Sequence, residues 1–344
     1  MRAQFLLVSL AIILASSCTK GGVDNADLKA ITLSPYHLET KAGLYDSSNI
    51  LTEGEGGRLF GNFSTLAYKT STKEKYFMGP EWVYYMHYPE NPTASGWRFA
   101  KQNGQTIEFY NRYWPQTYAL DFFAYMPYDL SDSHVTIDKD NQSFSCNLPT
   151  DKVGQDVTKE FVYAFSTEQS PESVSTTDGK VPLTFIHPFA AVRFKLGNAH
   201  GNTTINSVGF DGIYTQGTFS TLSGNSTQGD LTHNDWTPGP GEKTAFSITV
   251  GKNIPEDIQI GNPIGDTYIV MPQAFDETSI LTVSFIWDGT HNRSVQLGDG
   301  NSWEPGKIYT YTLNLGNSDE DAIASVSVEA WDDFGGYKND VEVE

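Results

Sequence analysis

The chain has little of the cysteine and closely spaced histidine that build zinc centres. Cys18 and Cys146 are its two cysteines in 344 residues, and none of its seven histidines forms an H-x-x-x-H pair. Zinc sites need several such ligands at short spacings, so we expect no zinc site. Asp138 and Asp140 resemble the first half of a calcium loop, but the glycine at position six and the distal glutamate are missing. The sequence predicts neither a metal nor a cofactor.

Catalytic signatures and basic residues are also scarce. There is no G-x-S-x-G elbow, phosphate-binding loop or dinucleotide fingerprint, and we expect the protein not to be an enzyme. The chain has 22 Lys and Arg against 42 Asp and Glu, for a net charge of -20. Binding to nucleic acid needs a surface of Lys and Arg that faces phosphates. The charge therefore argues against a nucleic-acid partner.

Helical periodicity is absent from the sequence, because no amphipathic stretch of three or more turns stands out. What is present are short aromatic runs separated by Gly, Asn and Asp turns, which favour an all-β sandwich. Residues 118–125 are nearly all apolar and predict a central strand in which Phe122, Phe123 or both are buried. Residues 136–149 predict a hairpin, with Cys146 as an ordinary strand residue.

The first residues of the chain are typical of an export signal. Arg2 precedes an apolar stretch at 5–14, and Ala-Ser-Ser then leads to Cys18. The apolar stretch is too short to span a bilayer. A cysteine directly after small residues resembles a bacterial lipoprotein signal, although Leu14 sits one place earlier than usual. We expect a signal peptide at 1–17 and a lipid on Cys18, and this leaves Cys146 without an intramolecular disulfide partner.

Residues 181–197 organise the rest of the chain. Apolar residues stand at odd positions before His187-Pro188 and at even positions after it. A strand changes phase only at a bulge or a break, and proline fits there because it has no N–H to donate. We therefore expect one β domain at 42–188 and a second at 189–344, with His187 buried near the break. The seven tryptophans are expected mainly in the cores, with a sugar-binding platform as the alternative.

Several motifs together resemble the fimbrillin family, the type V pilins of Bacteroides-type bacteria. They are W-P at 114–115, L-D-F-F-A-Y-M-P at 120–127, F-V-Y-A at 161–164, V-P-L-T-F-I-H-P-F-A-A-V-R-F-K-L at 181–196, Y-I-V-M-P-Q at 268–273, W-E-P-G-K-I-Y-T-Y at 303–311, and a valine-containing strand that ends in Trp331. The resemblance implies two tandem transthyretin-like Greek-key β-sandwich domains. It also implies a structural or accessory subunit of a surface fimbria, assembled by donor-strand exchange and serving adhesion.

The resemblance further implies a protease that removes the first strand after a basic residue, usually Arg. The matching strand here lies at 28–33 within a tether at 18–41, with Leu28, Ile31 and Leu33 as its apolar residues. The matching basic residue is Lys41, which departs from Arg, and Arg58 is the alternative. The candidate donor strand carries Val326, Val328 and Ala330, and Val341 and Val343 offer a second, shorter donor.

The expected partners are other fimbrial subunits, the outer membrane through the lipid, and a host protein or glycan. The expected location is the cell surface. The competing hypothesis is a surface lipoprotein that binds glycan through an aromatic platform with polar groups around it. The subunit hypothesis requires a removable first strand and a donor strand, whereas the glycan hypothesis requires an exposed aromatic platform with polar groups at its rim.

Overall fold

The structure, a computed structural model, describes residues 29–36, 52–53, 57–72, 76–87, 91, 96–103, 106–131, 133–150, 161–219, 230–241, 243–298, 300–316 and 323–331. Within these ranges the regular elements are β-strands and two short 3-10 helices, and none is an α-helix. The expectation of an all-β protein is therefore confirmed. No helix in the described part is long and apolar enough to cross a membrane.

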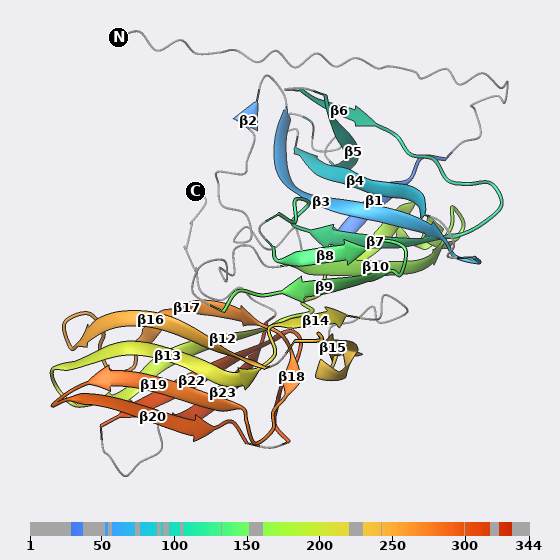
Figure 1. Ribbon diagram of the computed structural model, residues 1–344. Helices are drawn as coiled ribbons and strands as arrows, with labels where there is room; N and C mark the ends of the chain where they lie inside the picture. The colour runs from blue at the N-terminus through green and yellow to red at the C-terminus, as the bar shows by residue number, and fades with distance from the viewer. Residues whose placement is uncertain are drawn as a thin grey trace, which may run out of the picture. The chain divides into compact units, whose positions relative to one another are not determined.

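Contacts divide the chain into two units (Figure 1). Unit 1 ends at Phe185 and contains the chain up to Tyr128 together with Tyr163–Phe185. Unit 2 contains Asp129–Val162 and everything from Ile186 onward. The division lies three residues before the boundary expected at 188/189. It also groups residues 129–162 with the second unit, whereas the sequence analysis placed them in the first domain.

Unit 1 is built around one large sheet whose strand order is β10-β7-β3-β4-β5-β6, with β2 paired to β3. Its elements are β1 (Thr32–Tyr36), β2 (Thr52–Glu53), β3 (Gly57–Lys69), β4 (Tyr76–His87), β5 (Gly96–Asn103), β6 (Thr106–Tyr110), β7 (Leu120–Met126), β10 (Val162–Gln169), the 3-10 helix η5 (Ser173–Thr177) and β11 (Lys180–Thr184). Strand β7 is buried on both faces, and Phe122 and Phe123 are both fully buried, as expected.

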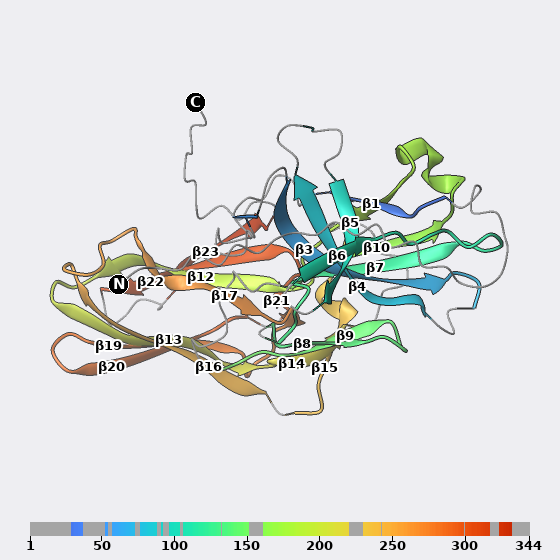
Figure 2. The same cartoon turned by 90° about the horizontal axis from the view of Figure 1, so that it is seen from above.

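Unit 2 contains two four-stranded sheets, ordered β17-β12-β22-β23 and β16-β13-β19-β20, which Figure 2 shows as two layers. A third sheet has the order β15-β14-β9-β8, and β18 pairs with β21. The elements are β8 (Val135–Asp138), β9 (Ser143–Asn147), β12 (Ala190–Ala199), β13 (Thr203–Ile213), β14 (Gln216–Phe219), the 3-10 helix η7 (His233–Asp235), β15 (Trp236–Pro238), β16 (Thr244–Ile254), β17 (Pro263–Val270), β18 (Gln273–Ala274), β19 (Ile280–Ile286), β20 (Thr290–Gln296), β21 (Ser302–Trp303), β22 (Lys307–Leu315) and β23 (Ile323–Ala330).

The core of unit 2 lies between its two layers. Alternate residues of β12 point into it, namely Ala190, Val192, Phe194 and Leu196, and they meet β13, β16, β19 and β22 from both sheets. This confirms the even-numbered apolar phase after Pro188. Strand β11 ends at Thr184 and β12 starts at Ala190, so the expected break falls at 185–189. The hairpin expected at 136–149 is formed by β8 and β9, with Cys146 buried in β9.

Candidate functional site

The first described strand occupies a slot in unit 1. Strand β1 pairs in parallel with β11, with Thr32 opposite Lys180 and Tyr36 opposite Thr184. On its other side the Ile31 N–H donates to the Arg112 carbonyl at 2.7 Å, and the Trp114 N–H donates to the Lys29 carbonyl at 3.0 Å. The segment is therefore held by main-chain hydrogen bonds on one side at Lys29 and Ile31 and on the other side along β1. Main-chain bonds of this kind do not depend on the side chains of the strand that makes them.

The side chains of this segment alternate between the core and solvent. Ile31 is 3% exposed and Leu33 is 4% exposed, whereas Thr32 between them faces solvent. The two residues expected to fill a groove are thus buried. Strand β1 covers Thr32–Tyr36, so both its start and its end lie later than in the strand expected at 28–33, and Pro35 continues the pairing opposite Leu183. Whether the strand is removed stays a prediction, and Cys18, Leu28 and Lys41 lie outside the described residues.

Arg58, the alternative cleavage site, lies inside β3. Its backbone pairs with Thr52 on one side and His87 on the other. Proteases cut most readily in exposed, unpaired segments, and a strand paired on both sides must open before it can enter an active site. The backbone at Arg58 therefore favours Lys41 as the proposed cleavage site.

The candidate donor strand β23 is an edge strand of unit 2. Among the described strands it pairs with β22 alone, with Val328 opposite Tyr309 and Val326 opposite Tyr311. Tyr309 and Tyr311 are buried in the core, but Val326 and Val328 are 46% and 54% exposed. Ser325 through Ala330 are all exposed. An exposed apolar edge of this kind is a template for pairing with another strand.

Trp331 anchors the end of this exposed strand. Its indole is 1% exposed and stacks on the buried His187 ring, with centroids 5.0 Å apart. Its backbone N–H donates to the Gly306 carbonyl at 2.8 Å. His187 is buried as expected, and its ring lies against the indole that closes β23. The sequence pattern alone gave no sign of this pairing.

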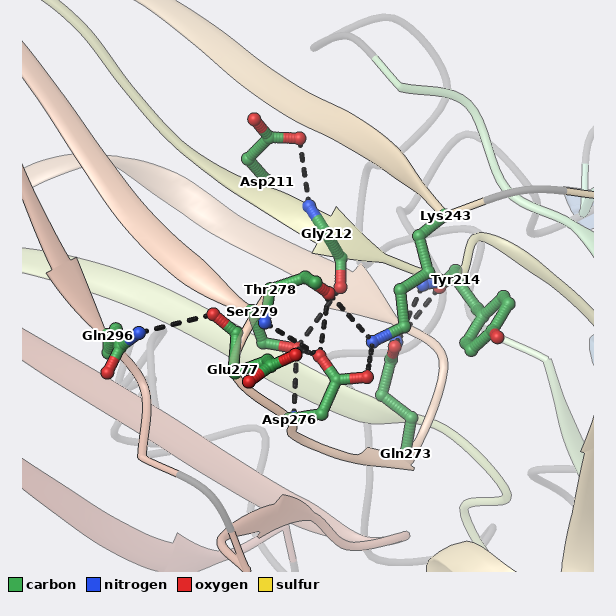
Figure 3. A network of polar contacts seen from close by, with 10 residues as sticks. All are labelled: Asp211, Gly212, Tyr214, Lys243, Gln273, Asp276, Glu277, Thr278, Ser279 and Gln296. Atoms are coloured by element: carbon green, nitrogen blue, oxygen red, sulfur yellow. Dashed lines mark hydrogen bonds and ion pairs between the residues drawn. The ribbon is translucent and has the colours of Figure 1, made fainter.

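A polar network ties β13 to the turn before β19 (Figure 3). The Lys243 ammonium donates to Asp276 Oδ2 at 2.5 Å, and Asp276 Oδ1 accepts from the Thr278 N–H and hydroxyl. These hydrogen bonds, that from Lys243 first, hold the pKa of Asp276 well below its ordinary value. Ser279 Oγ donates to the Gly212 carbonyl at 3.1 Å. The carboxylate is fully used in holding the turn, so the network is structural.

Gly212 shows why this connection requires glycine. Its φ is +67°, a left-handed conformation that glycine adopts easily. A Cβ at this position would lie 1.9 Å from the Thr278 carbonyl oxygen. The close approach of β13 to the turn therefore depends on the missing side chain.

A pocket of about 450 Å³ opens beside this network in unit 2. Among the described residues its lining is neutral, and its polar groups are amides and hydroxyls, including those of Asn147, Tyr214, Thr215 and Thr244.

Two other residues considered for chemistry have local structural roles. The Asp138 carboxylate accepts hydrogen bonds from the N–H groups of Asp140 and Asn141 and from the Asn141 side chain, which closes the β8–β9 turn. Within the described residues no group of three or more His, Cys, Asp or Glu can hold a metal ion. Burial raises the pKa of the Cys146 thiol to about 12, so it stays protonated at neutral pH and is a core residue.

The seven tryptophans divide clearly by burial. Trp114, Trp236, Trp303 and Trp331 are buried, and Trp82 and Trp97 are half-buried. The exception is Trp287, which is 43% exposed. The expectation that most are core residues is confirmed for the four buried ones, and the structure identifies the single exposed indole.

Comparison with known proteins found one matching family model and several similar solved structures. The family model described as fimbrillin-like matches residues 52–331. A fimbrial protein from Bacteroides vulgatus is similar, with 15% identity, 88% of this chain and 99% of that chain covered, and a TM-score of 0.49. A putative cell adhesion protein from Bacteroides uniformis has 16% identity, coverage of 83% and 100%, and a TM-score of 0.47. The tip fimbrial protein Mfa3 from Porphyromonas gingivalis has 8% identity, coverage of 79% and 94%, and a TM-score of 0.40. No curated protein matches the chain.

Proposed function

Because the chain belongs to the fimbrillin-like family, whose model matches residues 52–331, we propose that it is a non-enzymatic structural or accessory subunit of a cell-surface fimbria. The subunit assembles with other fimbrial subunits by donor-strand exchange and serves adhesion. The observation that carries this proposal is the slot of unit 1, in which residues 29–31 bond to Arg112 and Trp114 and β1 pairs with β11. The transthyretin-like topology of both sandwiches is part of the same proposal.

Cleavage after Lys41 would start assembly. It removes the covalent connection between the first strand and the rest of unit 1. The strand then stays only through its main-chain bonds and the burial of Ile31 and Leu33. Once it leaves, unpaired N–H and C=O groups line both sides of an apolar slot, and an unpaired edge accepts a new strand.

The proposed donor is the C-terminal part of another copy. Strand β23 supplies Val326, Val328 and Ala330 in alternation, with the two valines exposed. The tail beyond Trp331 is the alternative donor, through Val341 and Val343. Both candidates carry apolar residues two apart, which matches the spacing of Ile31 and Leu33 in the slot.

A Lys-specific protease tests the assembly step. Treating the purified precursor should give SDS-resistant ladders, because cleavage after Lys41 frees the slot. A Lys41→Gln variant treated identically controls for cuts at other lysines and should give no ladder. Chains that end at residue 331 or at residue 322 should be cut equally. Loss of ladders in both identifies the tail as donor, and loss only in the shorter chain identifies β23. If Lys41 is cut and the product stays monomeric, the exchange mechanism is wrong.

The lipid anchor has its own test. Cys18→Ala should abolish labelling by a radioactive or alkyne-tagged fatty acid and leave unprocessed precursor, because the thiol is the acyl acceptor. We propose that this lipid holds the precursor at the outer membrane, since each buried CH₂ contributes about 0.8 kcal/mol to membrane binding. Cys146→Ala is the matched control and should be labelled normally. Unchanged labelling of Cys18→Ala would refute the lipidation site.

A further inference from the structure

The exposed indole of Trp287 lies at one end of the unit 2 sandwich. It belongs to the first residue of the turn between β19 and β20, and Figure 1 shows the hairpin that these two strands form. The His200 ring, in the turn between β12 and β13, stacks on it with centroids 3.7 Å apart and planes at 8°. Ile186, where unit 2 resumes, precedes the opposite end of β12. The indole is therefore at the end of the sandwich away from the start of β12.

Hydrogen bonds hold both turns that carry the stacked Trp287 and His200 rings. The Trp287 N–H donates to the Gly289 carbonyl at 3.2 Å, and Thr203 Oγ1 donates to the His200 carbonyl at 2.7 Å, so both turns are held. The His200 ring covers one face of the indole, the His291 ring centroid lies 6.3 Å from that of the indole, and Trp287 still remains 43% exposed. The result is a rigid aromatic surface that needs little ordering when something binds to it.

Polar groups stand next to this surface. Asp288 follows Trp287, and its Oδ1 lies 2.6 Å from His291 Nε2. His291 is held in turn by stacking on the buried Phe285 ring, with centroids 5.2 Å apart. The side chain of Asp288 is 66% exposed, so a ligand can approach its carboxylate. The residue next to the exposed indole therefore offers acceptor oxygens, and the His291 imidazole holds its side chain.

We propose that Trp287, Asp288 and His291 form a binding site for a sugar, in which the C–H face of a pyranose ring stacks on the indole. Sugar rings combine an apolar C–H face with hydroxyl groups around the edge. The indole matches the first feature, and Asp288 accepts hydrogen bonds from the second. The His200 stack keeps the platform in place without using the exposed face.

The size of the apolar surface favours a sugar over a protein partner. A stable protein interface buries about 800 Å² on each partner. Ile286, the last residue of β19, is exposed next to Trp287, and two part-exposed side chains cover much less area than such an interface. Ile260 is exposed in the turn between β16 and β17, which follows Ile254 opposite Thr203 and lies at the same end of the sandwich. A single indole with a carboxylate beside it has the dimensions of one or two sugar units.

Saturation-transfer NMR on the full chain tests this site. The probes are the methyl pyranosides of galactose, glucose, N-acetylglucosamine and fucose. We expect transfer to the ring C–H protons of at least one of them. Trp287→Ala should weaken the binding of that sugar at least tenfold, and Asp288→Asn should weaken it several-fold. Ile260→Ala is the matched control, because it removes an exposed apolar side chain from another turn, and it should bind like the parent.

Three results would overturn the proposal. The first is no transfer to any of the four sugars. The second is unchanged binding by Trp287→Ala, with circular dichroism confirming that the variant is folded. The third is an equal loss in Ile260→Ala and Trp287→Ala, which would indicate a wider apolar surface for a protein partner. Sugar binding does not depend on strand exchange, so this test and the protease test fail independently.

Discussion

Replacing Trp303 with alanine should lower the free energy of unfolding of unit 2 by about 3–5 kcal/mol, because it leaves a large cavity in the core. The Trp303 side chain is fully buried and meets Phe210 and Phe275 edge to face, at 4.9 and 5.0 Å between ring centroids. Its Nε1–H donates to the Tyr311 hydroxyl at 2.9 Å. One substitution therefore removes packing to two rings and the partner of a buried hydroxyl. Urea unfolding followed by circular dichroism measures the loss.

Two variants divide this loss into its parts. Trp303→Phe keeps most of the volume but leaves the Tyr311 hydroxyl without its donor, and it should cost about 1–3 kcal/mol. Trp287→Ala removes the same side chain from an exposed site of the same unit and should cost about 1 kcal/mol, mainly through its stack on His200. If Trp303→Ala were as stable as Trp287→Ala, the packing described for this core would be wrong.

Replacing both Ile31 and Leu33 with aspartate should expel the first strand from its slot without any cleavage. Each aspartate would place a charge without a partner at a buried apolar position, which costs several kcal/mol. The opened slot should then make the uncut chain self-associate. Light scattering after size-exclusion chromatography measures the mass, and hydrogen exchange reports opening at β11.

The matched control is Thr32→Asp, which adds the same charge to the exposed side of the same strand. It should stay monomeric and keep slow exchange in β11. If the double variant stayed monomeric and its β11 amides stayed protected, the described packing of Ile31 and Leu33 in the slot would be wrong. Such a result would mean that the first strand contributes little to unit 1.

The sequence was most informative where apolar runs are regular. The continuous run in β7 predicted a strand buried on both faces, and the Asp138 turn predicted the β8–β9 hairpin. The phase change at Pro188 predicted the break between β11 and β12. These features follow from local pattern and turn chemistry, so neighbouring residues were enough to find them.

Features that depend on distant residues could not be predicted. The grouping of 129–162 with unit 2 rests on β9 pairing with β14, where Phe144 lies opposite Phe219. The stack of Trp287 on His200 joins two turns that no sequence pattern connects. Strand β1 passes Pro35 because a proline is tolerated where its missing N–H is not needed by a partner strand.

The parallel pairing of β1 with β11 has a consequence for the order in which unit 1 folds. The Thr32 hydroxyl bonds to the Gly179 carbonyl, 147 residues further along the chain. Strand β1 can therefore pair only after β11, one of the last parts of unit 1, has formed. Until then, both β1 and the slot can pair with strands of other copies. The entropy cost of closing a loop grows only slowly with its length, so the long connection between β1 and β11 adds little to this cost. The same connection keeps the chain's own strand at a high local concentration around the slot. In an uncut chain, the covalent connection therefore favours the chain's own first strand over strands from other copies. If one peptide bond were broken, the concentration of neighbouring copies would decide which strand fills the slot.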